Sequence, residues 1–184
     1  MIVSSLDDIV DLYAARGGQT YGEGVTQIEH AVQCAALAEA GGAAPALVVA
    51  SLLHDIGHLL VDPEDAAAFR FDDRHETAGA DALRTLFGEA VSQPVALHVS
   101  AKRYLCFIEP AYRSGLSTAS QKSLALQGGA FDRSQAETFE RESGWREAVA
   151  LRRLDDHGKS DEAAQRRFPD FIPLMRRLVV ITGA

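Results

Sequence analysis

The chain has 184 residues, of which 47% are hydrophobic and 24% are charged, a balance typical of one globular domain with a sizeable core. Its formal net charge of -8 argues against a nucleic-acid-binding surface, and the sequence contains neither a signal-peptide pattern nor an apolar stretch near the roughly 20 residues that span a bilayer. Two cysteines, Cys34 and Cys106, are too few for a disulfide framework, so we expect buried free thiols and a reducing, cytoplasmic setting.

Apolar residues recur at helical spacing along the chain, and no convincing two-residue alternation predicts a strand. In the first half, we expect helices at 5–15, 25–40, 45–60 and 75–86, with a loop at 19–24 and an acidic surface segment at 62–74. In the second half, we expect helices at 89–107, 117–127, 144–157 and 170–181, a short helix with a capping box at Ser134, and a loop at 110–115. No repeat or long linker divides the chain. The sequence therefore predicts one all-α domain over residues 1–184, with a motif-bearing core at about 20–160.

An adjacent ionisable pair, His54-Asp55, interrupts the apolar run at 50–58, which ends with His58. Burying such a pair is costly unless its charge is compensated, and a metal ion is the usual compensation. His54 and His58 are spaced to share one helix face, with Asp55 about 100° round the axis. Imidazole and carboxylate ligands suit Fe, Mn, Zn or Ni, and one carboxylate can bridge two metals. Further candidate ligands are His30, His75, His98 and the acidic pair Asp155-Asp156.

Cationic side chains occur one helical turn from several of these ligands. Lys102 follows His98 by four residues, and Arg152 precedes Asp155 by three. In a chain with a net charge of -8, cations on the ligand face predict a focused anion site. The alternative is that both cations lie on solvated helix faces, which is their usual position. His157 lies at a helix end, where we expect it at the surface.

The order His, His-Asp, His, His, Asp resembles the HD-domain superfamily of metal-dependent enzymes. Longer blocks are more specific, above all His98-Val-Ser-Ala-Lys-Arg-Tyr-Leu105 and Ser123-Leu-Ala-Leu-Gln-Gly-Gly129. Together with Tyr21–His30, His54–His58, His75–Asp81 and Leu151–Lys159, they resemble the PhnZ-type HD oxygenases, which cleave the carbon–phosphorus bond of 1-hydroxyphosphonates. The resemblance spans roughly residues 20–160.

This resemblance implies a fold, a cofactor and a set of roles. It implies a helical bundle around two iron ions, Fe(II)/Fe(III), with O2 as co-substrate and a pathway hydroxylase that makes the 1-hydroxyphosphonate without necessarily forming a complex. The implied ligands are His30, His54, Asp55 and Asp155 for one iron, and His75 and His98 for the other, with Asp55 bridging. The implied catalytic residues are His54, Asp55, His58 and Lys102, and the implied substrate-binding residues are Tyr21, Glu23, His58, Lys102, Ser120, Gln127 and Arg152. Asp156 is offset by one residue, so we expect it to be solvated or to cap the helix end.

The loop before the first ligand helix departs from the family pattern. Some members carry Tyr-x-x-Glu there, in which the Tyr occupies an iron position until substrate arrives and the Glu holds the substrate's amino group. Here Glu23 matches the acid, but Tyr21 is one residue late and Thr20 occupies the Tyr position. The resemblance therefore implies 2-amino-1-hydroxyethylphosphonate or an N-methylated or otherwise substituted analogue as substrate.

Two other functions compete with a diiron oxygenase. A metal-dependent phosphohydrolase would attack a nucleotide or phosphate ester with a metal-bound hydroxide and would need no oxygen. The low aromatic content, 7%, weakly disfavours a nucleotide. A metal-stabilised binding module would close its ligand set, and the extra cations near the ligands argue against it.

Overall fold

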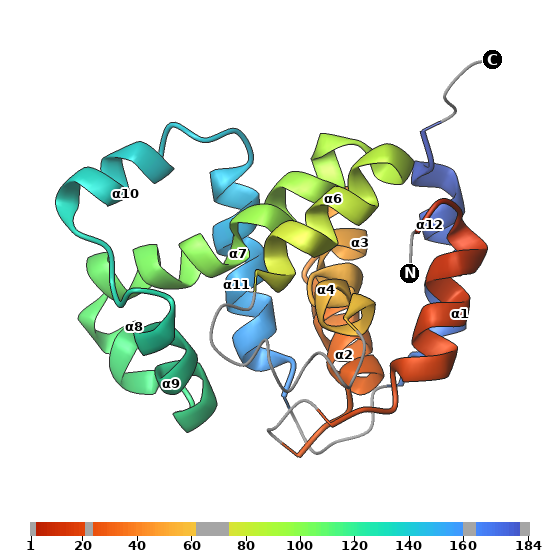
Figure 1. The fold of residues 1–184 in the computed structure, drawn as a ribbon, viewed down its shortest axis with the longest axis horizontal. Helices are drawn as coiled ribbons and strands as arrows, with labels where there is room; N and C mark the ends of the chain where they lie inside the picture. Colours follow the sequence, from red (N-terminus) through yellow and green to blue (C-terminus); the bar gives the residue numbers. More distant parts are fainter. Residues whose placement is uncertain (1–2, 21–23, 62–73, 160–164, 181–184) are drawn as a thin grey trace.

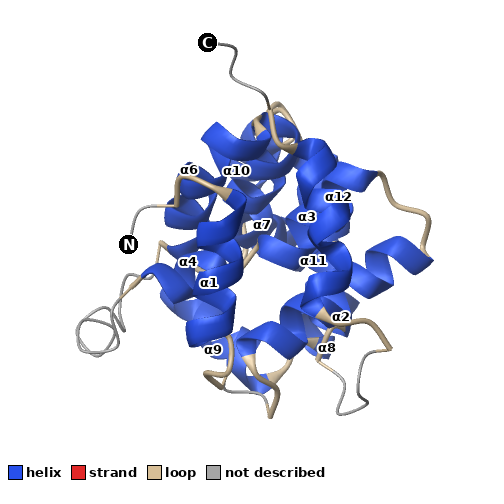
Figure 2. Ribbon diagram, turned by 90° about the vertical axis from the view of Figure 1, so that its right-hand side faces the viewer, coloured by secondary structure: helices blue, strands red, loops and turns tan. Residues whose placement is uncertain are grey.

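The computed structural model describes residues 3–20, 24–61, 74–159 and 165–180, and these residues are mostly helical (Figure 2). No strand occurs within these ranges, where the one β-bridge joins Thr20 and Thr26. The first elements are α1 (Leu6–Arg16), α2 (Gln27–Ala40), α3 (Pro45–Leu53), α4 (Ile56–Leu60), α6 (His75–Phe87) and α7 (Glu89–Ile108). The remaining elements are α8 (Pro110–Gly115), α9 (Thr118–Leu126), α10 (Arg133–Phe139), α11 (Trp145–His157), the 3-10 turn η1 (Phe168–Phe171) and α12 (Ile172–Leu178). The all-α prediction is confirmed.

Helix ends follow the local chemistry of the sequence. Ser5 caps α1, because its hydroxyl accepts the Asp8 backbone N–H while the Asp8 carboxylate accepts the Ser5 backbone N–H. Thr26 and Glu29 form the same reciprocal pair at the start of α2. Most other predicted helices start and end within two residues of the observed bounds, as expected for helix ends.

Four predictions about local structure were wrong. The helix expected at 45–60 is two helices, because α3 ends at Leu53 and α4 begins at Ile56. Residues 110–115 form the short helix α8 and not a loop, with Pro110 in its first turn, where a missing N–H costs nothing. The capping box of α10 uses Asp132 and Gln135 and not Ser134. The last predicted helix starts late, at Ile172 after η1, and ends early, at Leu178.

The break between α3 and α4 places His54 and Asp55 at a helix joint. Asp55 leaves helical geometry, with φ -98° and ψ 10°. Just beyond it, Gly57 touches the backbone of His75 so closely that any Cβ at this position would collide with the His75 carbonyl. The glycine therefore lets α4 cross the start of α6, which brings two ligand-bearing segments together.

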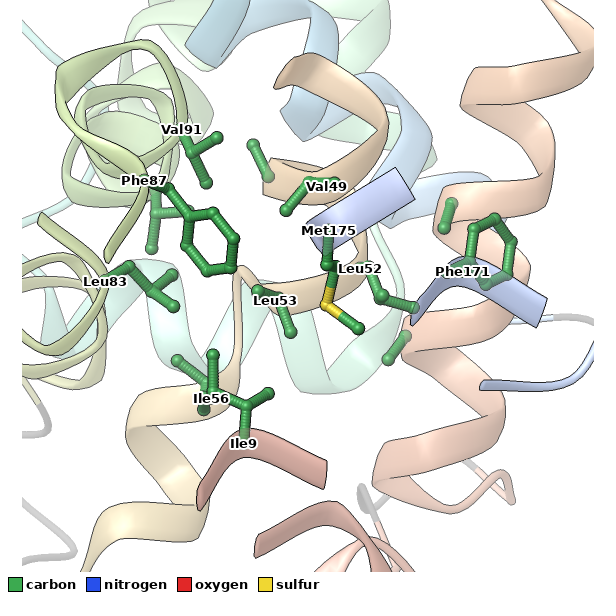
Figure 3. Packing of buried hydrophobic residues seen from close by; sticks show 14 of the residues in the cluster. Ile9, Val49, Leu52, Leu53, Ile56, Leu83, Phe87, Val91, Phe171 and Met175 are labelled. Carbon is green, nitrogen blue, oxygen red and sulfur yellow. The ribbon is translucent and has the colours of Figure 1, made fainter. Parts of the chain in front are cut away.

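The largest hydrophobic cluster lies between α1, α3, α6, the start of α7 and the C-terminal elements, close to this joint (Figure 3). Its labelled members are Ile9, Val49, Leu52, Leu53, Ile56, Leu83, Phe87, Val91, Phe171 and Met175. Each fully buried aliphatic side chain of this kind contributes about 1.5–3 kcal/mol. The long helix α7 packs against α6, α3 and α11, and extends to the opposite end of the molecule, where α8, α9 and α10 lie (Figure 1). Two smaller buried clusters, around Tyr104 and around Cys106, stabilise that end.

Candidate metal centre

Six buried side chains predicted as ligands meet where five segments of the chain converge. His30 comes from α2, His54 and Asp55 from the joint, His75 from the first position of α6, His98 from α7 and Asp155 from α11. All six are at most 8% exposed. The fold thus brings these six side chains into one cluster, although His30 and Asp155 are far apart in the sequence.

One half of the cluster is the pair His30 and His54. Their Nε2 atoms are 3.2 Å apart. Oδ2 of Asp55 lies 3.7 Å from His30 Nε2 and 3.4 Å from His54 Nε2. Oδ1 of Asp155 lies 3.3 Å and 3.9 Å from the same two nitrogens. Two imidazole nitrogens and two carboxylate oxygens therefore surround one point.

The other half is the pair His75 and His98, whose Nε2 atoms are 3.1 Å apart. The second oxygen of Asp55, Oδ1, lies 3.5 Å from His75 Nε2 and 3.7 Å from His98 Nε2. The two oxygens of Asp55 therefore face two different histidine pairs, which is the arrangement of a carboxylate that bridges two cations.

The outer nitrogens of three imidazoles contact main-chain carbonyls. The Nδ1 atoms of His30, His54 and His98 lie 2.8, 2.9 and 2.7 Å from the carbonyl oxygens of Gly158, Ser51 and Val95, respectively. His75 Nδ1 lies 3.5 Å from Glu76 Oε2. A carbonyl can only accept, so each of the three Nδ1 atoms donates and each Nε2 offers a lone pair to the centre. Metal-binding histidines are oriented in the same way.

The donor set fits two cations. As neutral rings, His30 and His54 cannot hydrogen-bond to each other, because the lone pairs of their Nε2 atoms face each other at 3.2 Å. Asp55 Oδ2 and Asp155 Oδ1 are buried and have no hydrogen-bond donor among the described residues. Orphaned buried oxygens are costly, and cations between the oxygens and the imidazoles would satisfy both. Imidazole with carboxylate suits iron, manganese, zinc or nickel.

The ionisation of the cluster matches a ligand role. Burial lowers the pKa values of His54 and His98, which keeps both rings neutral. Burial alone would raise the pKa of Asp55, but the neighbouring imidazoles, His54 first, hold it below its usual range. Against the same effect of burial, Arg152 holds the pKa of Asp155 well below its usual range. The carboxylates are thus charged, and His54 and His98 are neutral and can donate electron pairs. Against the lowering effect of burial, Cys34 and Asp155 raise the pKa of His30 well above its usual value.

Cationic side chains gather beside Asp155, on the side of α9. Lys102 Nζ donates to Ser123 Oγ at 2.8 Å, and Ser120 Oγ lies 3.4 Å from both Arg152 Nη2 and Lys159 Nζ. Lys102 and Arg152 are only 3% and 4% exposed, so neither lies on a solvated helix face. We call Lys102, Ser120, Arg152 and Lys159 the cation cluster. It combines buried positive charge with hydroxyl groups, which are the groups that bind an oxyanion.

Arg152 makes several contacts at once. Its Nη1 pairs with Asp155, its Nη2 pairs with Asp156, and its Nε donates to the Tyr112 hydroxyl at 3.0 Å. Asp156 was expected to be solvated or to cap the helix end. That expectation was wrong, because Asp156 also accepts a hydrogen bond from Tyr112 and is only 18% exposed at its side chain.

Two further predicted residues, His58 and Gln127, lie around this region. His58 does not continue the face of His54, because the helix breaks between them, and its ring instead stacks on His75 with centroids 4.0 Å apart. Gln127 ends α9, and its buried Oε1 has no hydrogen-bond partner among the described residues. Arg103 fixes the turn after Gln127, because its Nε donates to the carbonyl of Gly129 at 2.8 Å.

Other predictions concern residues away from the cluster. Tyr21 and Glu23 lie outside the described residues. His157 is exposed, as predicted, and its Nδ1 contacts the Arg153 carbonyl. Cys34 and Cys106 are free and buried, as predicted, and Cys34 Sγ lies 3.8 Å from the ring nitrogens of His30.

Sequence reasoning missed Lys159, Ser123 and Tyr112. Two of them carried a usable signal, since Lys159 follows Asp155 by four residues and Ser123 follows Ser120 by three, one helical turn each. Tyr112 carried none, because the segment was predicted as a loop and its contacts bridge 40 or more positions.

The chain matches a known domain family and is similar in sequence to several known proteins. An HD domain model matches residues 28–127, more than half of the chain. A protein of Gimesia maris named hydroxymethylphosphonate dioxygenase is 46% identical over 153 residues, which cover 82% of this chain and 76% of that protein. A protein of Leisingera caerulea named [1-hydroxy-2-(trimethylamino)ethyl]phosphonate dioxygenase (glycine-betaine-forming) is 38% identical over 173 residues, which cover 91% and 87%. An uncharacterized protein, L432, of Acanthamoeba polyphaga mimivirus is 33% identical over 162 residues, which cover 86% and 74%.

None of the helices in the described residues is both long and apolar enough to cross a bilayer. The HD match, the similarity to two phosphonate dioxygenases over most of both chains, and the histidine–aspartate cluster agree with one another. The chain belongs to the HD-domain family, and within it to the PhnZ-type phosphonate oxygenases.

Proposed function

We propose that this protein is a diiron oxygenase that uses O2 to cleave the C–P bond of a 1-hydroxyphosphonate and releases inorganic phosphate and a carboxylate. The substrate would be 2-amino-1-hydroxyethylphosphonate or an N-methylated or otherwise substituted analogue. The observation that carries the proposal is a carboxylate facing two histidine pairs, with a buried cation cluster beside it. The names of two relatives support oxidative chemistry on a phosphonate and leave the phosphohydrolase alternative less supported.

The proposed reaction balances without an added reductant. R–CH(OH)–PO3(2-) and O2 give R–COO(-), HPO4(2-) and one proton. The C–H and C–P bonds at C1 break, one oxygen atom is gained at carbon and one at phosphorus, and the electrons of those two bonds reduce O2. The protein therefore needs to hold the substrate and O2 at one centre and to keep bulk water away.

In this proposal His30, His54, Asp55 and Asp155 hold one iron, and His75 and His98 hold the other, with Asp55 shared. The metal pair would supply a binding place for O2 and for the substrate's hydroxyl group and would accept and return electrons. His54 and Asp55 act as ligands, and the main-chain carbonyl behind His54 fixes its ring. His58 stacks on His75 at the edge of the ligand set, where its ring can hydrogen-bond to substrate.

The cation cluster would bind the phosphonate oxygens. Lys102 and Arg152 contribute buried charge, Ser120 contributes a hydroxyl, and Gln127 contributes an amide whose N–H groups can donate to an oxyanion. An oxyanion gains most from such groups in a site of low exposure, where water does not screen the charges. Roles for Tyr21 and Glu23 at the opposite end of the substrate stay predictions from the sequence.

The setting of the enzyme is also a proposal. A 1-hydroxyphosphonate is itself an oxidation product, so a hydroxylase acting earlier would supply it, without a stable complex. Two buried free thiols are typical of a reducing compartment, and we propose a cytoplasmic location.

The test is phosphate release and oxygen uptake by iron-loaded protein. The panel would contain hydroxymethylphosphonate, 2-amino-1-hydroxyethylphosphonate, its trimethylamino analogue and a phosphate ester. We expect phosphate release from at least one phosphonate with one O2 consumed per phosphate, and none without oxygen. Release from the ester in the absence of oxygen would instead establish a phosphohydrolase.

A further inference from the structure

Tyr112 has no role in the ligand set or in the cation cluster, yet its hydroxyl lies at the outer edge of Arg152. It comes from the six-residue helix α8, and its hydroxyl accepts the Arg152 Nε hydrogen at 3.0 Å while donating to Asp156 Oδ2. Burial raises the pKa of Tyr112 above its usual value, and Asp156 raises it further against the effect of Arg152. The phenol therefore keeps its proton and can make both hydrogen bonds.

Arg152 needs such a partner because several groups compete for its terminal nitrogens. Its Nη1 is drawn to Asp155 and its Nη2 to Asp156, and only a 3.4 Å contact joins Nη2 to Ser120 Oγ in the cation cluster. A guanidinium has five N–H groups in one rigid plane, so fixing Nε fixes where both terminal nitrogens point. Tyr112 fixes Nε, and it also holds the far oxygen of the carboxylate that pairs with Nη2.

We propose that Tyr112 is a positioning residue for phosphonate binding, which acts through Arg152 and does not touch substrate. Together with Asp156 it holds the guanidinium plane so that the Nη2 edge faces Ser120. This inference rests on the proposed function only for the identity of the anion. A simpler role would be to fasten α8 to α11, as the Glu109–Arg153 ion pair already does.

The chain offers two matched controls, one for the loss of a tyrosine hydrogen bond and one for a weaker contact between α8 and α11. Tyr104 donates to Glu140 at 2.6 Å, which is the same kind of tyrosine–carboxylate bond at a place where neither residue contacts Arg152. Glu109→Gln weakens the fastening of α8 to α11 through Arg153 and leaves Tyr112 in place. Tyr104→Phe thus controls for the lost hydrogen bond, and Glu109→Gln controls for the interface.

The experiment compares Tyr112→Phe with both controls in iron-loaded protein. The readouts are the Kd of methylphosphonate, which lacks the reacting hydroxyl, by calorimetry, together with kcat, KM, iron content and Tm. We expect Tyr112→Phe to raise Kd and KM about 5- to 10-fold, the worth of one ordinary hydrogen bond, because the effect reaches the anion only through Arg152, while kcat changes less than about 2-fold and iron content is kept. Both controls should bind methylphosphonate like the wild type.

A double-mutant cycle identifies the route of the effect. In an Arg152→Lys background there is no Nε, so Tyr112→Phe should weaken binding no further. A Kd for Tyr112→Phe equal to that of the controls, or an equal additional loss in the Lys background, would overturn the proposal. The same follows if wild-type protein binds no methylphosphonate. The protein could also show the expected rise in the methylphosphonate Kd of Tyr112→Phe but release no phosphate from any hydroxyphosphonate. That result would uphold the role of Tyr112 and reject the proposed function.

Discussion

The metal centre and the cation cluster are neighbours, but different groups hold their side chains. Main-chain carbonyls orient three of the ligand imidazoles, and the ligands lie beside the largest hydrophobic cluster. The cations instead contact hydroxyls and carboxylates of other side chains, and the short helices α8 and α9 pack around a small cluster of Cys106, Leu116 and Leu124. A main-chain carbonyl is still present after almost any substitution of its residue, whereas a side-chain hydroxyl or carboxylate is lost. Single substitutions can therefore displace the cations of this cluster while the metal ligands stay in place.

The largest effect should come from the shared carboxylate. Asp55→Asn removes the charge that faces both histidine pairs, so we expect loss of metal from both and a fall in phosphate release of at least about 100-fold, the upper range for residues that only support ligands. Metal analysis of the purified variant checks this. His157→Ala, at an exposed histidine, should keep its metal. A full metal content in Asp55→Asn would show that Asp55 is not a ligand.

A steric change in the framework of the metal centre should come next. Gly57→Ala places a methyl group against the His75 carbonyl, so α4 and α6 must separate, at a cost of roughly 3 kcal/mol of unfolding free energy. Gly115→Ala is the control, because a Cβ there meets nothing within 4 Å. Urea denaturation of both variants measures the difference. Equal midpoints would contradict the close crossing of the two helices.

The cation cluster should respond to pH through Lys102. Burial, together with Arg152 and Lys159, lowers the pKa of Lys102 to about 8 against the opposite effect of Asp155 and Asp156. Its charge is present below pH 8 and lost above, so methylphosphonate binding should weaken about 10-fold from pH 7 to pH 9. Lys102→Arg should not show this loss, because arginine stays charged, and it controls for the ionisation of methylphosphonate itself over the same range. The same slope in both proteins would assign the titration to another group.

The lowered pKa of Lys102 should also affect the unfolding free energy, which should rise with pH while anion binding weakens. Unfolded Lys102 titrates near its model value of 10.5, so the unfolded chain binds more protons than the folded one between about pH 8 and 10.5. Relative to Lys102→Met, the wild type should therefore gain unfolding free energy as the pH rises through this window. Denaturation midpoints at pH 7.5 and 10 measure the gain, and parallel midpoints in the two proteins would contradict it.

The smallest effect should come from a supporting hydroxyl. Ser123 accepts from Lys102 at 2.8 Å and donates to the Ser120 carbonyl at 3.1 Å. Ser123→Ala should raise KM about 3-fold, as expected for one modest hydrogen bond. Ser114→Ala, which loses an exposed bond to the Pro110 carbonyl, should leave KM unchanged. If Ser123→Ala also leaves it unchanged, Lys102 does not depend on Ser123 for its position.

Sequence patterns predicted the helices and the candidate ligands because both depend on local spacing. Helical periodicity located α2, α6, α7 and α11, and the His-Asp pair stood out within an apolar run. The break after Leu53 was invisible, because the apolar run continues through it and only the crossing at Gly57 requires it. The contact of Asp156 with Tyr112 was equally invisible, since α8 is too short to show periodicity and Tyr112 lies 44 positions away.

The joint between α3 and α4 limits how the length of this chain can vary. Each residue of a helix turns the next by about 100°, so one residue added to or removed from α3 would rotate His54 away from His30. An added residue after Asp55 would carry Gly57 off its crossing with His75 and place a side chain there. The segment 51–58 can therefore accept some substitutions but no insertion or deletion. Relatives should differ in length at surface turns such as Gly41–Gly42, and a homologue with a gap in 51–58 should have lost the metal centre.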